Sequence, residues 1–556
     1  MNALLCSINS KYIHSSLSVW CLAGGIKEYA PEVHVKVIEA TINEEFEAIY
    51  ERIMEEDFDI IGFSTYIWNV ELVLRLSEII KKKTNKLIVL GGPEVSYNSK
   101  KLMEKYSFID FILCGEGEKS FALLCEYVPC EEISGLCYRL NGEIYINKNT
   151  ELIVDPPSPY IPEYFEKLNG RIAYIEASRG CPFSCAFCLS GRCEGVRFFD
   201  IEKIKKNIVD LANSGTKTIK FIDRTFNADK KRAIEIFKFI IENYGKKVPP
   251  SVCFHFEIEG ELVDNETINV LKTAPAGLFQ FEIGIQSFNS KTLESINRKC
   301  KINRLTEKIN QIINLGNIRV HIDLIIGLPY EDMRSFSTSF NEAYKLNAHM
   351  LQVGFLKILH GATIEEMKEK FNFDYSERPP YEILSTQWLS FNEIEDLHLL
   401  EEVFEKMYNS NRFVRTCNYL VNLAKSPFDL FMTLGKLWNK DKKTNSLNEF
   451  SLFLYNSAIE HFGADTKILR DAMALDRLSS NHNATLPEFL KIHSRKIKQL
   501  LLELDKDPKT KRRKNVKRSA TLLASEHKFV YVDYINKNKI KNHYEICEKF
   551  IEIDEI

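Results

Sequence analysis

The chain has 556 residues, of which 45% are apolar, with 74 lysines and arginines against 77 aspartates and glutamates. This length exceeds one ordinary hydrophobic core and predicts three or four domains at about 150 residues each. The near-balanced charge gives no reason to expect a polyanionic partner. Because the sequence has no secretory-signal pattern at its start and no apolar run that spans a bilayer, we expect a cytoplasmic protein without membrane contact.

Residues 1–130 alternate short apolar runs such as "FDIIGFSTY" and "KLIVLGGPE" with amphipathic segments such as "VELVLRLSEIIKKK". This alternation predicts an α/β domain, a doubly wound parallel sheet of Rossmann-like type covered on both faces. Ligands of such sheets bind at the carboxyl ends of the strands. Those ends read Ser64-Thr65-Tyr66, Gly91-Gly92-Pro93 and Gly115-Glu116-Gly117.

Residues 131–170 combine a hairpin signal with a proline-rich linker. Asn141-Gly142 stands between two alternating runs, a pattern typical of a tight β-hairpin. The segment "DPPSPYIPEYF" contains four prolines, which predict a stiff, extended connection between domains.

Residues 171–365 return to alternating strands and helices, with six apolar strands beginning at "RIAYIEAS" and ending at "MLQVGFLKIL". Six strand–helix units predict a partial parallel (β/α)6 barrel with its functional residues at the strand carboxyl ends. Residues 366–556 are predicted to be mainly helical, apart from the strand-like "HKFVYVDYI". A basic run at 509–518 is interpreted as a solvated loop, with RNA phosphates as the alternative ligand.

Cys181, Cys185, Cys188 and Cys193 lie within sixteen residues, directly after the first of these six strands. A structural zinc site normally uses two short pairs of ligands separated by a longer spacer, and a thioredoxin-type motif uses one pair, so the C-x3-C-x2-C triplet matches neither. On a short loop, this spacing suits three corners of a [4Fe-4S] cluster whose fourth iron has no protein ligand. Cys193 lies outside the triplet and is interpreted as a spare thiol.

The stretch "CPFSCAFC" resembles the signature of the radical S-adenosylmethionine (radical SAM) superfamily. The resemblance implies that SAM chelates the open iron and that Phe187 lies near its adenine. By the same resemblance, "FEIGIQS" nominates Glu282, Gln286 and Ser287 near the SAM ribose and carboxylate, and "IIGLP" nominates Ile325 and Gly327 beside adenine. "FIDRTFN" departs from the usual Gly-Gly-Glu stretch, which leaves the roles of Asp223 and Asn227 open.

The N-terminal strand ends resemble the cobalamin-binding domain of the cobalamin-dependent radical SAM class. In that class a Gly-Gly turn admits the dimethylbenzimidazole tail, because glycine lacks a Cβ, and a serine or threonine bonds to the tail. The lower face of cobalamin is expected to meet Tyr66 and Trp68 without a histidine ligand. His14 in "YIHSSL" is the alternative ligand, although the carboxylate that usually supports such a histidine is missing.

The resemblance implies that a SAM-derived 5′-deoxyadenosyl radical abstracts hydrogen from an unactivated carbon, which methylcobalamin then methylates. A flavodoxin or ferredoxin would supply electrons. Three alternatives remain: a cobalamin-dependent reduction or rearrangement without methyl transfer, an RNA-modifying enzyme, and a cobalamin sensor without catalysis. The strand ends "GFST" and "GGPE" contain no cysteine, which argues against the second cluster of a methylthiotransferase.

Overall fold

The computed structural model describes residues 1–148, 152–193, 195–441, 446–482, 484–507, 517–526, 528–535, 537–540 and 542–550. The chain folds into two compact units. The first comprises Met1–Ile283, Glu294–Lys301 and Leu356–Leu384, and the second comprises Gly284–Leu293, Ile302–Phe355 and Ser385–Ile556. Within the described residues, we find no helix with the length and apolar character needed to cross a membrane.

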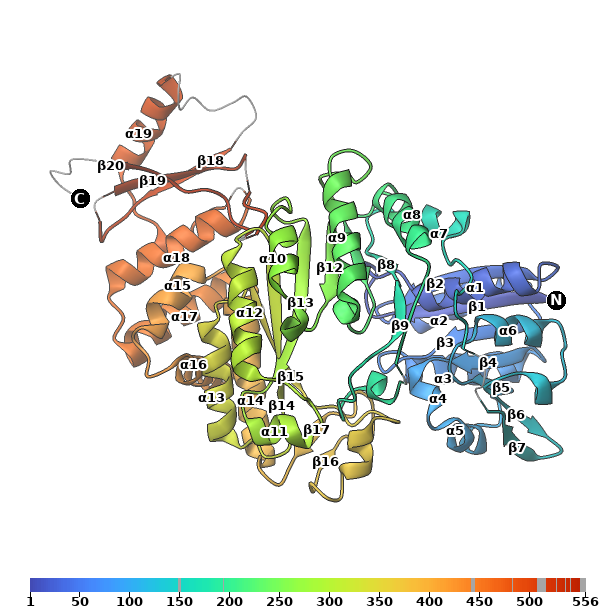
Figure 1. The fold of residues 1–556 in the computed structure, drawn as a ribbon. Coiled ribbons are helices and arrows are strands. Elements are labelled where there is room, and N and C mark those ends of the chain that lie inside the picture. Colours follow the sequence, from blue (N-terminus) through green and yellow to red (C-terminus); the bar gives the residue numbers. More distant parts are fainter. Residues whose placement is uncertain are drawn as a thin grey trace. The chain divides into compact units, whose positions relative to one another are not determined.

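The first unit opens with a seven-stranded sheet in the order β2-β1-β3-β4-β5-β6-β7, whose first five strands are parallel (Figure 1). This order confirms the predicted doubly wound sheet. The strands are β1 (Asn2–Asn9), β2 (His34–Thr41), β3 (Ile60–Ser64), β4 (Leu87–Gly91), β5 (Phe111–Leu113), β6 (Leu136–Leu140) and β7 (Glu143–Ile146). The helices are α1 (Leu17–Tyr29), α2 (Phe46–Met54), α3 (Val70–Lys83), α4 (Pro93–Ser96), α5 (Ser99–Lys105) and α6 (Glu118–Cys125).

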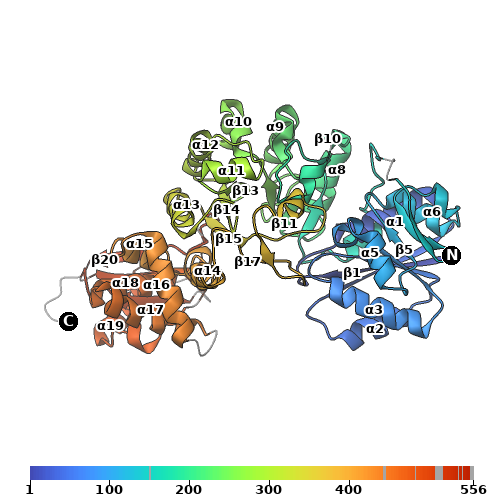
Figure 2. The ribbon, with the colours of Figure 1, turned by 90° about the horizontal axis from the view of Figure 1, so that it is seen from below.

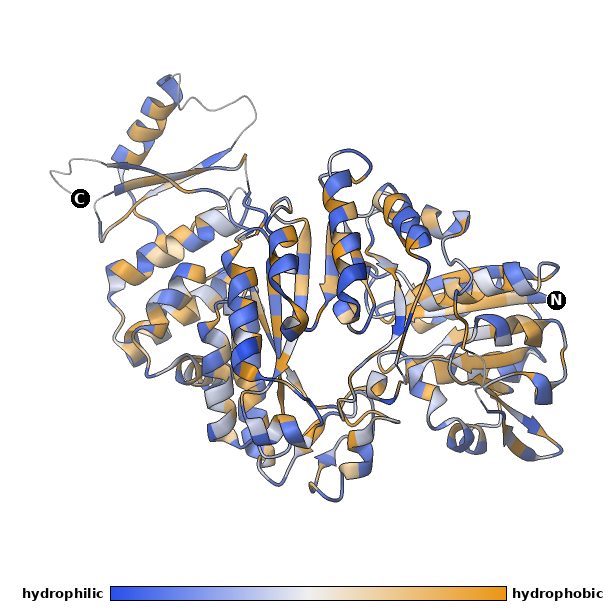
Figure 3. Cartoon of the chain, viewed as in Figure 1, coloured by the Kyte–Doolittle hydropathy of each residue, from blue (hydrophilic) through white to orange (hydrophobic). Residues whose placement is uncertain are grey.

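Both faces of this sheet are covered, as its continuous apolar strands require. Figure 2 shows α1 and α6 on one face and α2 and α3 on the other. On the second face Ile49 of α2 and Leu76 of α3 join a core with Leu4, Ile61 and Leu90 of the strands. The strands are accordingly orange along most of their length in Figure 3.

The predicted hairpin is present and lengthens this sheet. β6 pairs antiparallel with β5 and with β7, and the turn between β6 and β7 places Asn141 at φ 53° and Gly142 at φ 86°. Positive φ at both turn residues is what an Asn-Gly hairpin provides. The hairpin, which the sequence grouped with the linker, therefore forms the edge of the N-terminal sheet.

Two glycines in α1 allow other backbone segments to approach closely. A Cβ on Gly24 would lie 2.4 Å from the carbonyl oxygen of Ser158 in the proline-rich segment. A Cβ on Gly25 would lie 2.3 Å from that of Glu118, at the start of α6. Because both distances are far below van der Waals contact, the linker and α6 can pack against α1 only where these residues are glycine.

The first unit continues with β8 (Ala173–Ile175), β11 (Thr218–Phe221), β12 (Cys253–Glu257) and β13 (Phe279–Gln286), which pair in parallel in that order. Phe237 of α9 covers one face of these strands, 5.2 Å from Phe256 and 5.3 Å from Phe279 between ring centroids. The remaining elements here are α7 (Pro162–Glu166), β9 (Ser178–Gly180), β10 (Val196–Phe198), α8 (Ile201–Ala212), α9 (Lys230–Asn243), α10 (Asn265–Leu271), β16 (Asp374–Tyr375) and β17 (Ile383–Ser385).

β13 leads from the first unit into the second, where β14 (Arg319–Ile326) and β15 (Met350–Phe355) pair in parallel. All six strands expected between 171 and 365 are therefore present, each of the first five followed by a helix. Here the helices are α11 (Ser290–Ser295), α12 (Ile302–Asn314) and α13 (Met333–Lys345).

The rest of the second unit is mainly helical, as predicted, and ends in an antiparallel sheet of β18, β19 and β20. The sequence predicted only β19. The elements are α14 (Phe391–Phe404), a π-helix (Glu405–Asn409), α15 (Val414–Val421), α16 (Pro427–Asp441), α17 (Leu447–Phe462), α18 (Thr466–Ser480), α19 (Arg495–Lys506), β18 (Arg518–Leu522), β19 (Lys528–Asp533) and β20 (Cys547–Phe550).

Most of the basic run at 509–518 lies outside the described residues. Of its last two members, Arg518 is in β18 and donates to both carboxylate oxygens of Asp533, at 2.6 and 2.8 Å. Its side chain is 2% exposed. Arg518 is therefore part of the sheet rather than a free cation.

Candidate functional site

The cysteine loop follows β8 and β9 and turns tightly on itself. Cys185 is buried, Cys181 and Cys188 are half-buried, and Cys193 is exposed. The amide of Cys188 donates to the carbonyl of Cys185 at 3.2 Å, and that of Gly191 donates to Cys188 at 3.0 Å. A Cβ on Gly191 would lie 2.4 Å from the Cys185 oxygen, so glycine is needed for this turn.

The loop is fixed to the segment that follows α11. The amide of Ala186 donates to the carbonyl of Ile296 at 2.8 Å, and the side chain of Asn297 donates to the Ser184 carbonyl at 3.0 Å. These bonds hold the backbone on either side of the buried Cys185.

Arg298 gives the loop a positive neighbour. Its Nη1 lies 3.8 Å from Cys185 Sγ, and its Nη2 forms a 2.9 Å ion pair with Glu259. Burial raises the pKa of the Cys185 thiol, and Arg298 opposes that rise. On another side, Thr225 Oγ1 lies 3.4 Å from Cys181 Sγ. Three soft sulfur donors beside a guanidinium that favours thiolates fit an iron–sulfur cluster.

Asp223 and Asn227, whose roles the sequence left open, are engaged by the protein itself. Asp223 accepts hydrogen bonds from Ser178 Oγ at 2.5 Å and from the Ala177 amide at 3.0 Å. Asn227 bonds to both the amide and the carbonyl of Glu259 at 2.9 Å. These side chains therefore fix the ends of β8, β11 and β12 relative to one another.

Among the residues nominated for SAM, Phe187 is half-buried in the cysteine loop. Glu282 on β13 accepts from Lys220 at 3.3 Å and contacts His255 Nε2 at 2.8 Å. The other nominees belong to the second unit, where Ser287 donates to Glu331 at 2.6 Å. There Gln286 has φ 71°, Gly327 has φ 88°, and Ile325 is half-buried.

The carboxyl ends of β3 and β4 meet in a tight turn. The amide of Thr65 donates to the Gly91 carbonyl at 2.7 Å. Gly92 has φ 114°, and a Cβ there would lie 2.5 Å from the Thr65 oxygen, so no other residue fits. Pro93, which follows it as the first residue of α4, is exposed.

Next to this turn, Ser64 carries a buried hydroxyl with no hydrogen-bond partner among the described residues. Thr65, by contrast, is fully buried and its hydroxyl faces the Phe63 carbonyl at 3.5 Å. A buried polar atom without a partner is costly in a native structure, so the Ser64 hydroxyl is available to bond to a ligand. Together with the glycine turn, Ser64 fits a site that accepts a nitrogen-bearing aromatic tail.

The loop after β3 presents a flat aromatic surface. The rings of Tyr66 and Trp68 stack with centroids 4.5 Å apart. Trp68 Nε1 donates to the Ile8 carbonyl at 3.1 Å, which fixes the indole while 44% of the residue stays exposed. Asn69 is buried and bonds to the carbonyls of Ile8 and Ser64. A half-buried tyrosine stacked on an exposed, immobilised indole is typical of a binding surface for a large planar ligand.

The third nominated strand end, Gly115-Glu116-Gly117, has a different arrangement. Gly115 has φ 88°, and a Cβ on Gly117 would lie 3.0 Å from Leu22. Glu116 forms ion pairs with Arg179, at 3.0 Å, and with Arg197. Its carboxylate therefore connects the N-terminal sheet to β9 and β10, on either side of the cysteine loop.

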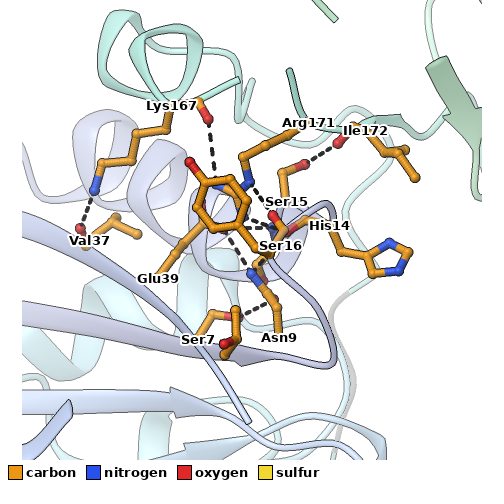
Figure 4. Close-up of polar contacts among 12 residues, drawn as sticks. Ser7, Asn9, His14, Ser15, Ser16, Val37, Glu39, Lys167, Arg171 and Ile172 are labelled. Atoms are coloured by element: carbon orange, nitrogen blue, oxygen red, sulfur yellow. Dashed lines mark hydrogen bonds and ion pairs between the residues drawn. The ribbon is translucent and has the colours of Figure 1, made fainter. Parts of the chain in front are cut away.

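Figure 4 shows how the loop that carries His14 is held. Arg171 forms a 2.6 Å ion pair with Glu39 and donates to the carbonyls of Tyr12 and His14. The imidazole of His14 points away from this cluster, and its Nδ1 lies 2.6 Å from the hydroxyl of Tyr174 on β8. Burial and nearby Lys11 lower the pKa of His14. Sequence reasoning missed Arg171 and Glu39, since neither belongs to a motif.

Three family models match successive parts of the chain. A B12 binding domain matches residues 5–124, the radical SAM superfamily matches residues 175–343, and a protein family of unknown function, DUF4080, matches residues 369–551. The first two matches contain the Gly91-Gly92 turn and the cysteine loop, respectively.

Among curated proteins, the chain is 26% identical to the cobalamin-dependent radical SAM methyltransferase TokK of Streptomyces tokunonensis, over 55% of this chain and 48% of TokK. It is 25% identical to the 2-(S-pantetheinyl)-carbapenam-3-carboxylate methyltransferase of Streptantibioticus cattleyicolor, over 53% of this chain and 46% of the relative. The chain thus spans about half the length of these relatives.

Among solved structures, the fold resembles the cobalamin-dependent SAM radical enzyme OxsB, with a TM-score of 0.56 at 16% identity over 91% of this chain and 80% of OxsB. It also resembles the radical SAM methyltransferase TsrM of Kitasatospora setae, with a TM-score of 0.55 at 15% identity over 68% and 79%. The chain carries a B12-binding domain followed by a radical SAM domain, and is homologous to cobalamin-dependent radical SAM methyltransferases.

Proposed function

We propose that this protein is an enzyme that methylates an unactivated carbon of its substrate, using a [4Fe-4S] cluster, SAM and cobalamin. The proposal rests on one observation. The cysteine loop and the turn at the ends of β3 and β4, which contains Ser64, Gly91 and Gly92, fold into one compact unit. Such a reaction needs a radical source and a methyl donor on one scaffold, since proximity supplies much of the rate.

In this proposal Cys181, Cys185 and Cys188 hold the cluster and Cys193 does not. Ser64 and the Gly91-Gly92 turn hold the nucleotide tail of cobalamin, beside the Tyr66–Trp68 surface. When bound, the cluster and SAM supply a hydrogen-abstracting radical and cobalamin supplies the methyl group. The protein's own contribution is to position these groups and to exclude water.

The strands of the first unit favour a polar substrate. Lys220 on β11 lies 3.1 Å from Glu257 and 3.3 Å from Glu282, and His255 also contacts Glu282. These side chains stand on the strand face opposite the buried phenylalanines and keep between 11% and 30% of their side-chain surface exposed. Because desolvating ionic groups against an apolar ligand is unfavourable, we propose a substrate with hydrogen-bonding or charged groups.

The enzyme requires a reductant, for which we propose a flavodoxin or ferredoxin, and hence a cytoplasmic location where thiols stay reduced. An RNA substrate gains no support from the described end of the basic run, since Arg518 is paired with Asp533.

The test is to purify the protein anaerobically with cobalamin, reduce it, and supply methyl-labelled SAM with polar metabolite extracts. We expect a labelled product together with 5′-deoxyadenosine and S-adenosylhomocysteine. Substrate turnover that yields 5′-deoxyadenosine without S-adenosylhomocysteine would contradict methyl transfer and indicate a reduction or rearrangement instead.

A further inference from the structure

Residues 356–384 leave the strand series after β15 and return to the first compact unit. We call this segment the strap. Its two ends are tied together, because the amide of Ile358 donates to the Tyr381 carbonyl and that of Ile383 donates to Leu356, both at 2.9 Å. The strap is therefore a closed loop with its own backbone bonds rather than a trailing connection.

One side of the strap contacts the cysteine loop. The amide of Ile364, a fully buried residue, donates to the carbonyl of Ala186 at 2.8 Å, next to Cys185. Glu366 forms an ion pair with Arg192, on the far side of Cys188. The strap thus holds both ends of residues 186–192, which contain Cys188 and directly follow Cys185.

The other side contacts the turn proposed to hold cobalamin. The hydroxyl of Tyr381 donates to Glu94, which follows Gly91-Gly92-Pro93 directly, and both side chains are buried. Gly361, with φ 88°, lies against the ring of Tyr97 just beyond α4, where a Cβ would be 2.2 Å from the ring. A buried carboxylate needs such a partner, because its desolvation is otherwise uncompensated.

The two contact regions are joined within the strap. Glu365 accepts from the Gly361 amide at 2.9 Å and lies 3.0 Å from His360 Nδ1. The ring of His360 meets that of Tyr381 with centroids 4.8 Å apart. A short chain of direct contacts therefore leads from Ile364 and Glu365, through His360, to Tyr381 and Glu94.

We propose that the strap couples the cobalamin turn to the cysteine loop, with Tyr381 as a positioning residue that acts on cobalamin through Glu94. Ordering the cysteine loop around its cluster then strengthens cobalamin binding, and cobalamin stabilises the loop by the same factor, since such linkage is reciprocal. The match to the family of unknown function begins at residue 369, within the strap, and includes Tyr381. We therefore assign this part of the family match a role in coupling the two sites. It rests on the proposed function.

The test is the dissociation constant of cobalamin, measured by absorbance titration on the full-length protein with and without its cluster. For the wild type we expect tighter binding when the cluster is present. Tyr381→Phe removes only the hydroxyl that bonds to Glu94, and we expect weaker binding by up to about tenfold, the limit set by the full value of one hydrogen bond. The difference in cobalamin affinity between the protein with its cluster and the protein without it should also become smaller.

Tyr375→Phe is the matched control, because Tyr375 lies in the same strap and forms no hydrogen bond through its hydroxyl among the described residues. It should bind cobalamin as the wild type does. Glu366→Gln, at a side chain that is 66% exposed, removes the negative charge that pairs with Arg192 of the cysteine loop. We expect it to leave cobalamin affinity unchanged without the cluster and to reduce the gain that the cluster brings.

The outcomes separate the two proposals. A wild-type protein that binds no cobalamin contradicts the proposed function, and the strap proposal falls with it. Cobalamin binding by the wild type that is the same in Tyr381→Phe and Glu366→Gln, in both cluster states, overturns the strap proposal alone. If Tyr381→Phe does not fold, Glu366→Gln decides the matter by itself.

Discussion

The guanidinium of Arg298 lies 3.8 Å from the Sγ of Cys185, and a 2.9 Å ion pair with the buried Glu259 holds it there. A fixed positive charge beside a thiolate ligand stabilises the more negative, reduced form of a cluster, because the field is weakly screened in a buried site. With Cys185 as a cluster ligand, as we propose, Arg298 would favour the entry of an electron.

Arg298→Met should lower the reduction potential of the cluster. The expected shift is on the order of 60 mV for one electron, a tenfold change in the equilibrium constant. An EPR-monitored redox titration measures it, and Lys231→Met, an exposed lysine on α9, is the control that should not move the potential. An unchanged potential in Arg298→Met would mean that its charge is screened from the cluster.

The cysteine assignment predicts an unequal response to four matched substitutions. Cys181→Ala, Cys185→Ala and Cys188→Ala should each lose the cluster's visible absorbance and most of the bound iron after anaerobic reconstitution. Cys193→Ala should retain both, because Cys193 is exposed and outside the triplet. Loss of iron in Cys193→Ala would indicate four protein ligands and leave no open iron for SAM.

Ser64→Ala tests the proposed contact between Ser64 and the nucleotide tail of cobalamin. Its hydroxyl has no partner among the described residues, so its loss should not lower the melting temperature of the cobalamin-free protein. Cobalamin affinity should fall about tenfold, the effect of one hydrogen bond of about 1.4 kcal/mol. Ser77→Ala removes a similarly buried hydroxyl from α3, one that also lacks a partner in the described part of the chain, and is the matched control. Equal cobalamin affinities in the two variants would place the tail elsewhere.

The Arg171–Glu39 ion pair predicts a stability effect. The two side chains are 6% and 5% exposed, so Glu39→Ala leaves a buried guanidinium without its charge partner, at a cost of about 3–5 kcal/mol. The melting temperature should fall clearly. Glu39→Gln combined with Arg171→Met should recover part of the loss, because the double variant leaves no unpaired charge. A Glu39→Ala variant as stable as the wild type would show that water reaches the site.

The sequence predicted the parts of the fold that depend on local pattern. The strands of the first sheet are continuous apolar runs, the Asn141-Gly142 turn needs two positive φ angles, and the triplet Cys181, Cys185 and Cys188 lies on one short loop. Each of these is determined by residues close together in the chain, where periodicity and turn chemistry apply.

What the sequence did not predict depends on residues far apart in the chain. Glu39 and Arg171 are 132 positions apart, and Glu94 and Tyr381 are 287 apart. A charged or phenolic residue read alone resembles any surface residue, because only its partner makes its burial favourable. Likewise Gly24 and Gly25 appear as weak helix formers until the backbones of Ser158 and Glu118 explain them.

Glu331 makes the stability of the second unit depend on pH. It is fully buried and accepts from Ser287 at 2.6 Å and Ser339 at 2.7 Å, and burial raises the pKa of Glu331 from 4.5 to about 7. The folded protein therefore holds a proton that the unfolded chain releases. Stability from this group is fully present below about pH 4.5 and is lost as pH rises to about 7, at about 1.4 kcal/mol per pH unit.

Glu331→Gln keeps an oxygen that accepts from both serines and cannot ionise. The melting temperature of Glu331→Gln should therefore fall less than that of the wild type between pH 5 and pH 7, the range between the unfolded and folded pKa of Glu331. Above this range the difference between the two melting temperatures should stay constant. Thermal denaturation across this range measures the difference, with Glu342→Gln, a half-buried residue on α13, as the control that keeps the wild-type slope. Parallel curves for the wild type and Glu331→Gln would mean that Glu331 is already ionised in the folded protein, with its charge compensated by the two serine hydroxyls.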